Sequence, residues 1–327
     1  MLNNQKIQYP QKLFFSKSGD FENMTTGTNA TDGMTFTIGS DQVNAIKYIK
    51  GLRTLLIGTT GGEFVATASS SAEPITPTNI QIKRQAGYGT SDVDALLAGN
   101  RVLFVQRAGK KVRELVFDFN SDGYVAPDLT ILAEHIGGSG VGTGFTNWTY
   151  QQEPDSIVWV VRSDGVLTGM TYQRSENVVA WHRHILGGAF GNGIAEVESV
   201  AAISNTVTSS RGEDTLYMIV KRTVNGSTVR YIEYLQPFDF GSNIEDAWFL
   251  DSGLVYSGSA TTTLSGLSHL EGQTVSILAN GSTHADKVVS SGAISLDRSV
   301  TKAIVGLKYT SKLQTMRIES GSADGSA

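Results

Sequence analysis

The sequence contains no cysteine among its 327 residues. This absence excludes a disulfide framework, a thiolate zinc site, an iron–sulfur cluster and a cysteine nucleophile. Basic residues are a minority too, since 26 lysines and arginines stand against 31 aspartates and glutamates, for a formal net charge of −5. A protein that coats DNA or RNA needs the opposite balance of charge.

Long apolar runs are also missing. No stretch approaches the ~18 consecutive apolar residues of a membrane-spanning helix. The N-terminal residues MLNNQKIQYPQKLFF lack the apolar segment of a secretory signal peptide. The sequence therefore predicts a protein that is synthesised in a cytoplasm and has no membrane span.

Glycine and short apolar runs dominate what is present. Glycine accounts for 36 residues and proline for only 6, so glycine-rich turns divide the chain. Short runs of Val, Ile, Leu, Phe and Tyr alternate with clusters of Gly, Asp, Asn and Ser, which is typical of strands and turns. No window longer than about three turns keeps the apolar spacing of an amphipathic helix. We therefore predict an all-β fold.

Four segments share one layout, in which an apolar strand, a short polar turn and a returning strand follow each other. Thr54, Val102, Ile157 and Thr215 mark equivalent positions, with spacings of 48, 55 and 58 residues. Periods of about 40–50 residues are typical of β-propeller blades. The repeat predicts propeller-like blades, which form an incomplete propeller or part of a larger one. A large β-sandwich is the alternative.

The predicted domains follow changes in composition. Residues 1–256 form the propeller-like domain, and the small polar residues of 257–268 favour a linker. Residues 269–319 contain about five short strand candidates and predict a small β-barrel or sandwich, with a turn at Asn280-Gly281. Residues 320–327 are expected to be a flexible tail.

Motif searches favour no enzyme. The sequence has no Gly-x-x-x-x-Gly-Lys-Ser/Thr loop and no Gly-x-Ser-x-Gly elbow, and 137–144 does not match Gly-x-Gly-x-x-Gly. We therefore predict no catalytic residue and no cofactor. Four carboxylates are conceivable partners in glycoside hydrolysis, but nothing in the sequence singles out a pair among Asp164, Glu176, Glu196 and Glu198.

Two segments resemble metal sites in part. Asp118, Asn120 and Asp122 match the first ligand positions of a calcium loop, and Gly123 matches its sharp turn. Leu129 stands where the loop needs glutamate, with Asp128 one residue early, so a turn built on Asx hydrogen bonds is favoured.

A pair of histidines is the second partial metal motif. His182 and His184 are two residues apart, so on a strand both point to one face. Since no third ligand is evident, a hydrogen-bonded pair beside Trp181 is favoured over a metal site. We therefore predict no metal.

Basic and aromatic residues also form two groups. The basic group could meet phosphates or an acidic subunit, although a solvated face or a protein interface is favoured; it comprises Arg84, Arg101, Arg107, Lys110, Lys111 and Arg113. The aromatic group could stack on sugars, although core packing is favoured; it comprises Trp148, Tyr150, Trp159 and Trp181.

Several strings, taken in order, resemble a known family. They are Gln11-Lys-Leu-Phe-Phe-Ser-Lys-Ser-Gly-Asp-Phe-Glu-Asn, Thr76-Pro-Thr-Asn-Ile, Asp122-Gly-Tyr-Val-Ala-Pro-Asp-Leu-Thr, Glu153-Pro-Asp-Ser-Ile-Val-Trp, Ser163-Asp-Gly-Val-Leu, Val179-Ala-Trp-His-Arg-His and His269-Leu-Glu-Gly-Gln-Thr-Val. Together they resemble the tail nozzle family of short-tailed bacteriophages, also called tail tubular protein B, and related prophage virion proteins. The resemblance spans residues 11 to 310.

This resemblance implies a virion structural protein that is made in the bacterial host cytoplasm. Its subunits would contain a β-propeller and assemble into a ring, typically a hexamer, below the portal and adaptor. The expected partners are other copies of the chain, the tail adaptor, and tail fibre or spike proteins. Genomic double-stranded DNA would leave through the ring with transient contacts that are independent of its sequence. The resemblance identifies no channel-lining residue.

Other functions and arrangements remain open at the level of the sequence. A host-surface module that binds or cleaves glycans is the main alternative function, and a cellular propeller scaffold is another. Members of the nozzle family are usually longer, so the chain could be part of a longer polypeptide or a shortened relative. An N-terminal strand near Gln11–Phe15 could close the propeller.

Overall fold

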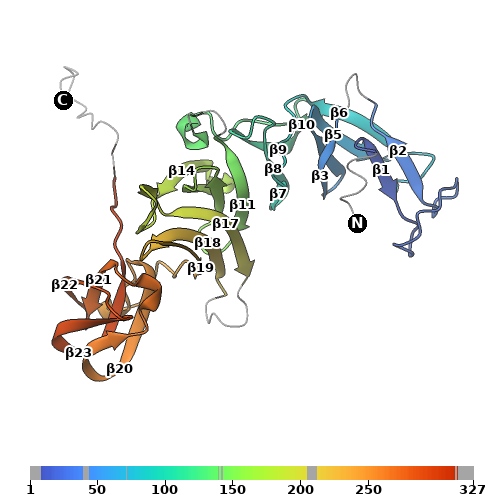
Figure 1. The fold of residues 1–327 in the computed structure, drawn as a ribbon. Coiled ribbons are helices and arrows are strands. Elements are labelled where there is room, and N and C mark those ends of the chain that lie inside the picture. The colour runs from blue at the N-terminus through green and yellow to red at the C-terminus, as the bar shows by residue number, and fades with distance from the viewer. Residues whose placement is uncertain are drawn as a thin grey trace, which may run out of the picture. The chain divides into compact units, whose positions relative to one another are not determined.

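The computed structural model describes residues 9–39, 44–70, 72–138, 140, 143–204, 212–313 and 315. The regular elements in these ranges are β-strands and four short 3-10 helices (Figure 1), which confirms the predicted all-β class. The helices are η1 (Glu134–Gly137), η2 (Arg174–Glu176), η3 (Ile244–Asp246) and η4 (Ser268–Leu270). Within the described residues, none is long and apolar enough to cross a membrane.

Three sheets have the form of propeller blades, because each consists of four antiparallel strands in chain order. The first sheet contains β3 (Ile46–Gly51), β4 (Leu55–Thr59), β5 (Gly62–Thr67) and β6 (Gln81–Ala86). The second contains β7 (Leu96–Ala98), β8 (Arg101–Val105), β9 (Val112–Asp118) and β10 (Gly123–Val125). The third contains β11 (Phe145–Gln151), β12 (Ile157–Arg162), β13 (Leu167–Gln173) and β14 (Val178–His184).

Three of the four predicted hairpins are the central strand pairs of these sheets. The first three hairpins correspond to β4–β5, β8–β9 and β12–β13. The fourth forms β18 (Asp214–Val224) and β19 (Ser227–Tyr234). Its turn has positive φ at both Asn225 and Gly226, as a tight hairpin turn requires.

The blade-like sheets pack face to face in chain order. Alternate residues of β8 point to opposite faces, so Val102 and Phe104 join the core shared with the first sheet, and Leu103 and Val105 join the core shared with the third. This explains why residues 102–105, Val-Leu-Phe-Val, are all apolar. Each fully buried Val or Leu contributes roughly 1.5–3 kcal/mol.

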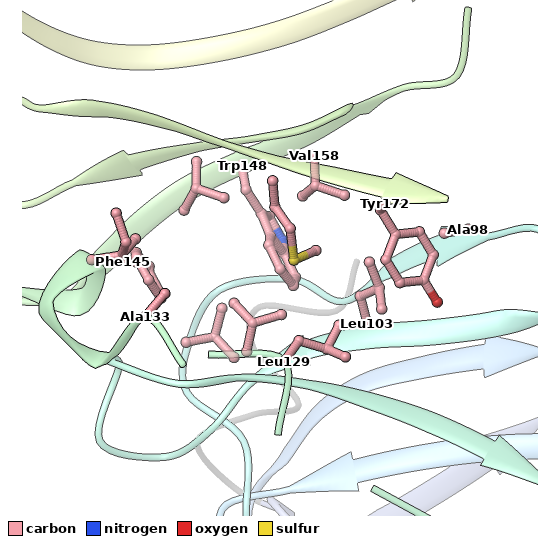
Figure 2. Packing of buried hydrophobic residues seen from close by; sticks show 13 residues of the cluster. Ala98, Leu103, Leu129, Ala133, Phe145, Trp148, Val158 and Tyr172 are labelled. Carbon is pink, nitrogen blue, oxygen red and sulfur yellow. The ribbon is translucent and has the colours of Figure 1, made fainter. Parts of the chain in front are cut away.

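The core between the second and third sheets contains three buried aromatic side chains, Phe145, Trp148 and Tyr172. Figure 2 shows Trp148 and Tyr172 of the third sheet facing Leu103 and Leu129. Leu129 lies in the loop after β10, so this connection also belongs to the core.

Three smaller sheets contain fewer strands. The two-stranded sheets are β1 (Lys12–Phe15) with β2 (Met34–Thr37), and β15 (Ala189–Phe190) with β16 (Gly193–Ile194). β17 (Glu196–Ser204), β18 and β19 form a three-stranded sheet. Because β1 pairs with β2, the alternative in which Gln11–Phe15 completes the last sheet is wrong for the described strands.

The C-terminal sheet differs in detail from the predicted module. It has four strands in the order β20-β23-β21-β22, which are β20 (Asp251–Ser265), β21 (Thr274–Ala279), β22 (Ser282–Val288) and β23 (Ala293–Leu307). The predicted linker at 257–268 is not observed, because residues 257–265 continue β20. Their Ser and Thr side chains suit an exposed strand as well as a loop.

The chain divides into two compact units, whose boundary differs from the predicted domain limits of 256 and 269. Unit 1 comprises residues 1–184 and 197–219, and unit 2 comprises residues 185–196 and 220–327. Each has its own buried core. The tail predicted at 320–327 lies outside the described residues.

Candidate functional site

Buried charged residues are the most distinctive polar feature of unit 1. The side chain of Glu63 on β5 is fully buried. Its carboxylate accepts hydrogen bonds from the backbone N–H of Tyr88 at 3.3 Å and from the Thr90 hydroxyl at 3.5 Å. Glu63 therefore ties its sheet to the segment that leads into the second sheet.

Burial raises the pKa of Glu63 to about 7, although the hydrogen bonds from Tyr88, Thr90 and Gly89 and the charge of Arg113 oppose the shift. The buried Tyr48 hydroxyl lies close enough to Glu63 for the charge of that carboxylate to act on it. Burial and the nearby Glu63 charge raise its pKa, and no hydrogen-bond partner contacts it among the described atoms.

A second buried glutamate lies between the second and third sheets. Glu114 on β9 pairs with Arg101 and with Arg174, whose Nε lies 3.1 Å from Oε2. The Tyr172 hydroxyl donates a further hydrogen bond to Oε2 at 2.9 Å. This carboxylate is thus fully occupied by partners from β8, β13 and η2.

Unit 2 contains a comparable buried group. Arg222 on β18 is fully buried and pairs with Glu233 on β19. Its Nε donates to the Gly187 carbonyl at 2.8 Å, and the Gly187 N–H donates to Asp251 at 2.6 Å. Burial raises the pKa of Asp251. These contacts join residues that are distant in the sequence and so serve the fold.

The segment that partly matches a calcium loop forms a turn. Both carboxylate oxygens of Asp118 accept backbone N–H groups, from Asn120 at 3.3 Å and Ser121 at 3.1 Å. Hydrogen bonds, the largest from the Ser121 side chain, lower the pKa of Asp118. Asp122 supplies the positive φ of the turn. The favoured Asx turn is therefore confirmed.

Asp128 interacts with other residues than those of that turn. It accepts the Thr130 hydroxyl at 2.5 Å and pairs with Lys111 at 3.0 Å. Burial raises its pKa, but these hydrogen bonds outweigh burial and lower it overall. Within the described ranges, no three His, Cys, Asp or Glu residues gather in a way that could hold a metal ion.

The histidine pair lies on one face of β14, as predicted. His182 Nδ1 and His184 Nε2 are 2.6 Å apart. The aromatic neighbour on this face is Trp159, whose ring centre is 5.7 Å from that of His182 and 5.0 Å from that of His184. Trp181, the neighbour expected from the sequence, instead stacks on Phe145 on the other face. Burial lowers the pKa of His182 and, together with the His182 charge, lowers that of His184 to about 4.

The remaining candidates do not form one site. Most of the basic group is engaged within the chain: Arg84 donates to Gly61, Arg101 pairs with Glu114, Lys110 donates to Gly140, Lys111 pairs with Asp128, and Arg113 donates to Ala126. Among the carboxylates, Asp164 pairs with Arg162, Glu196 pairs with Lys221, and Glu176 lies exposed in η2.

The predicted aromatic group belongs to the core and to the packing around it. Trp148 and Trp159 are buried, and their indole N–H groups donate to the Asp94 carbonyl and to Gln151. Trp181 and Tyr150 pack against the core between the second and third sheets. The predicted core role is thus observed, and these rings form no exposed platform.

Sequence reasoning missed Glu63, Glu114 and Arg222. The local signal was present, since each interrupts an apolar strand: GGEFVA, VRELVF and IVKRTV. A charge within such a run indicates a buried ion or hydrogen-bond network. Its partners lie far away in the sequence, so they could not be named.

Comparisons with known proteins show no family for this chain. No family model matches it, and no curated protein matches it. Two solved structures from Bacteroides thetaiotaomicron are similar at 8% sequence identity. One is a candidate phosphatase, with a TM-score of 0.36 over 57% of this chain and 48% of that one. The other is an auxiliary nutrient binding protein, with a TM-score of 0.34 over 85% of this chain and 62% of that one.

The chain thus spans about half to three-fifths of the length of these structures. At such TM-scores the likeness carries no argument. The blade-like architecture described above rests on the strand order and on the packing of this chain itself.

Proposed function

We propose that this protein is a structural component of a bacteriophage tail, which assembles with copies of itself into a nozzle ring below the portal and adaptor. In this proposal genomic double-stranded DNA leaves the virion through the ring, as the sequence resemblance implies. The ring would contain six subunits and would contact adaptor and fibre or spike proteins. The protein would act by assembly and not by catalysis.

The observation that carries the proposal is the exposed edge of β19. The sheet β17-β18-β19 has three strands, whereas each blade-like sheet has four, and among the described strands only β18 pairs with β19. Ile232 and Tyr234 on β19 are 77% and 54% exposed, and Phe238 after it is 89% exposed. Arg230 is exposed on the same face, so the strand carries both apolar and charged side chains. An unpaired strand edge can accept a strand from another chain.

The engagement of the candidate site residues supports a structural role as well. Buried charges are neutralised by ion pairs and hydrogen bonds that tie strands together, as for Glu114 and Arg222. The aromatic residues that could have stacked on sugars pack in the protein instead. The described structure thus offers no observation that favours the glycan-binding alternative.

The test is the native mass of the full chain, measured by light scattering and combined with negative-stain imaging. We expect closed rings with a central hole. A protein that stays monomeric at all concentrations and binds glycans in a screen would contradict the proposal. A variant of the β19 edge, described in the Discussion, tests whether this edge is the contact.

A further inference from the structure

His182 and His184 lie on the outer strand of the third sheet, and both are partly exposed. β14 pairs with β13 alone among the described strands. Opposite His182 on β13 is Gly169, which has no side chain. A Cβ atom at Gly169 would lie 2.1 Å from the His182 ring, so the imidazole occupies the space that this glycine leaves.

The two rings are already close enough to share one ligand. His182 Nδ1 and His184 Nε2 are 2.6 Å apart, and the ring planes are inclined by 81°. Two nitrogens that bind one metal ion at about 2.0 Å, with about 90° between the bonds, are about 2.8 Å apart. The observed separation is thus within a few tenths of an ångström of the distance that a metal in square-planar or octahedral geometry needs.

We propose that His182 and His184 form a two-imidazole binding site for a divalent late transition-metal ion, and that Cu²⁺ binds most tightly. Imidazole nitrogen is a good ligand for Cu, Ni and Zn, and Cu²⁺ binds such donors more strongly than the other divalent ions of the first transition row. Water completes the coordination, because the described residues offer no group of three ligands.

Binding requires a change of tautomer and a rotation of the two rings, so that both lone pairs point to the metal and not along the line between the nitrogens. In the pair without metal, one ring donates its N–H to the lone pair of the other ring. When the metal binds, that proton moves through solvent to the second nitrogen of the same ring, and both facing nitrogens then present lone pairs. No net proton is released, and the metal replaces the hydrogen bond as the link between the rings.

Trp159 provides a readout within the site. Its ring centre lies 5.0 Å from that of His184 and 5.7 Å from that of His182. A bound Cu²⁺ ion at this distance quenches indole fluorescence. The full chain, stripped with a chelator, is titrated with CuCl₂ alone, and in parallel with NiCl₂ and ZnCl₂. We expect one quenching site per chain in the micromolar range, with Cu²⁺ binding more tightly than Ni²⁺ or Zn²⁺.

Two variants and one matched control assign the site. His182→Gln and His184→Gln should each weaken Cu²⁺ binding by roughly tenfold or more, as the loss of ligand support does in other metal sites. His135→Gln removes an exposed histidine of η1 and should leave the affinity unchanged. Equal binding by all four proteins would overturn the proposal.

A measurement on the unaltered protein avoids any dependence on the folding of the variants. Electron paramagnetic resonance of the one-to-one Cu²⁺ complex should show coupling to two imidazole nitrogens. A signal from one imidazole or none, or saturation only at millimolar metal, would show that the pair is a hydrogen-bonded link between residues of β14 and nothing more.

Discussion

Glu63 and Glu114 are both fully buried in unit 1, but they are compensated differently. Glu114 has two arginine partners, whereas Glu63 accepts hydrogen bonds from the backbone N–H of Tyr88 and from the Thr90 hydroxyl. At Glu63 the cost of burial outweighs the hydrogen bonds and the charge of Arg113, so this carboxyl group keeps its proton more readily than an ordinary glutamate. Glu63 should therefore make the fold less stable as the pH rises, whereas an ion-paired carboxylate makes it more stable.

The wild-type protein should lose stability as the pH rises, and we expect Glu63→Gln to abolish this loss. The pKa of Glu63 is about 7 in the folded protein, against 4.5 for an unperturbed glutamate. The unfolded chain thus loses its proton first, so stability falls between about pH 4.5 and pH 7 and stays level above. The shift corresponds to about 3 kcal/mol. Thermal unfolding at about pH 5 and pH 8 should show a smaller drop for Glu63→Gln than for the wild type.

Glu114→Gln is the matched control, because the two glutamates are equally buried. It leaves Arg101 and Arg174 without their countercharge, so it should lower stability at both pH values. If Glu63→Gln instead lowered stability equally at both, Glu63 would be charged throughout this range and the assignment would be wrong.

Trp181 tests the choice between core packing and sugar binding at a single side chain. It stacks on Phe145 at 5.9 Å and donates its indole N–H to the Leu129 carbonyl at 2.9 Å. Trp181→Ala should therefore destabilise unit 1 by about 3–5 kcal/mol. Denaturant unfolding checks this value.

Phe119→Ala provides the comparison for Trp181→Ala. Phe119 is 86% exposed, and its removal should change stability by no more than about 0.5 kcal/mol. Under the glycan alternative, Trp181→Ala would instead abolish glycan binding and leave the unfolding curve in place.

At the scale of elements, the sequence predicts what is local and misses what is not. The hairpins were predictable because strand, turn and strand are contiguous, and Asn225-Gly226 and Asn280-Gly281 adopt the positive φ that such turns need. Short outer strands such as β7 and β10 lack a periodic signal. β20 was mistaken for a linker because its exposed Ser and Thr residues suit both structures.

For the candidate site, too, local features were predictable from the sequence and cross-strand contacts were not. The shared face of His182 and His184 was predictable from their spacing on one strand. Their aromatic neighbour was not, because Trp159 reaches them across β13 through strand register, which pairs both Trp159 and His182 with Gly169. Cross-strand neighbours depend on register, and a single sequence does not specify register.

The β19 edge carries a prediction about assembly. Ile232→Lys places a charge in the middle of this unpaired edge, and charged side chains prevent pairing between strand edges. We expect this variant to shift the native mass toward the monomer while the melting temperature of the monomer stays unchanged. Light scattering and thermal unfolding measure the two quantities.

Ser299→Lys is the matched control for this change. Ser299 is also exposed, but it belongs to β23, which lies in a different sheet from β19. This variant should assemble like the wild type. Rings formed equally well by both variants would show that subunits meet elsewhere, and the support for ring assembly from this edge would be lost.

At the scale of the whole molecule, the two units should unfold as separate cooperative bodies. Unit 1 has the cores between its sheets, and unit 2 has a core built from η4 and β20 to β23. Buried contacts within a unit make its unfolding cooperative, whereas few contacts across a boundary allow the units to melt independently. The chain passes between the units after residues 184, 196 and 219, and the last of these crossings lies within β18.

Two core substitutions decide whether β18 couples the units. Trp148→Ala removes a buried ring from unit 1, and Ile277→Ala shortens a buried side chain in unit 2. Each should cost about 2–5 kcal/mol. In calorimetry we expect two transitions, each lowered by one variant and unaffected by the other. A single transition that each variant lowers would mean that the two units unfold together, coupled through β18. A subunit contact at β19 would then stabilise the whole chain and not unit 2 alone.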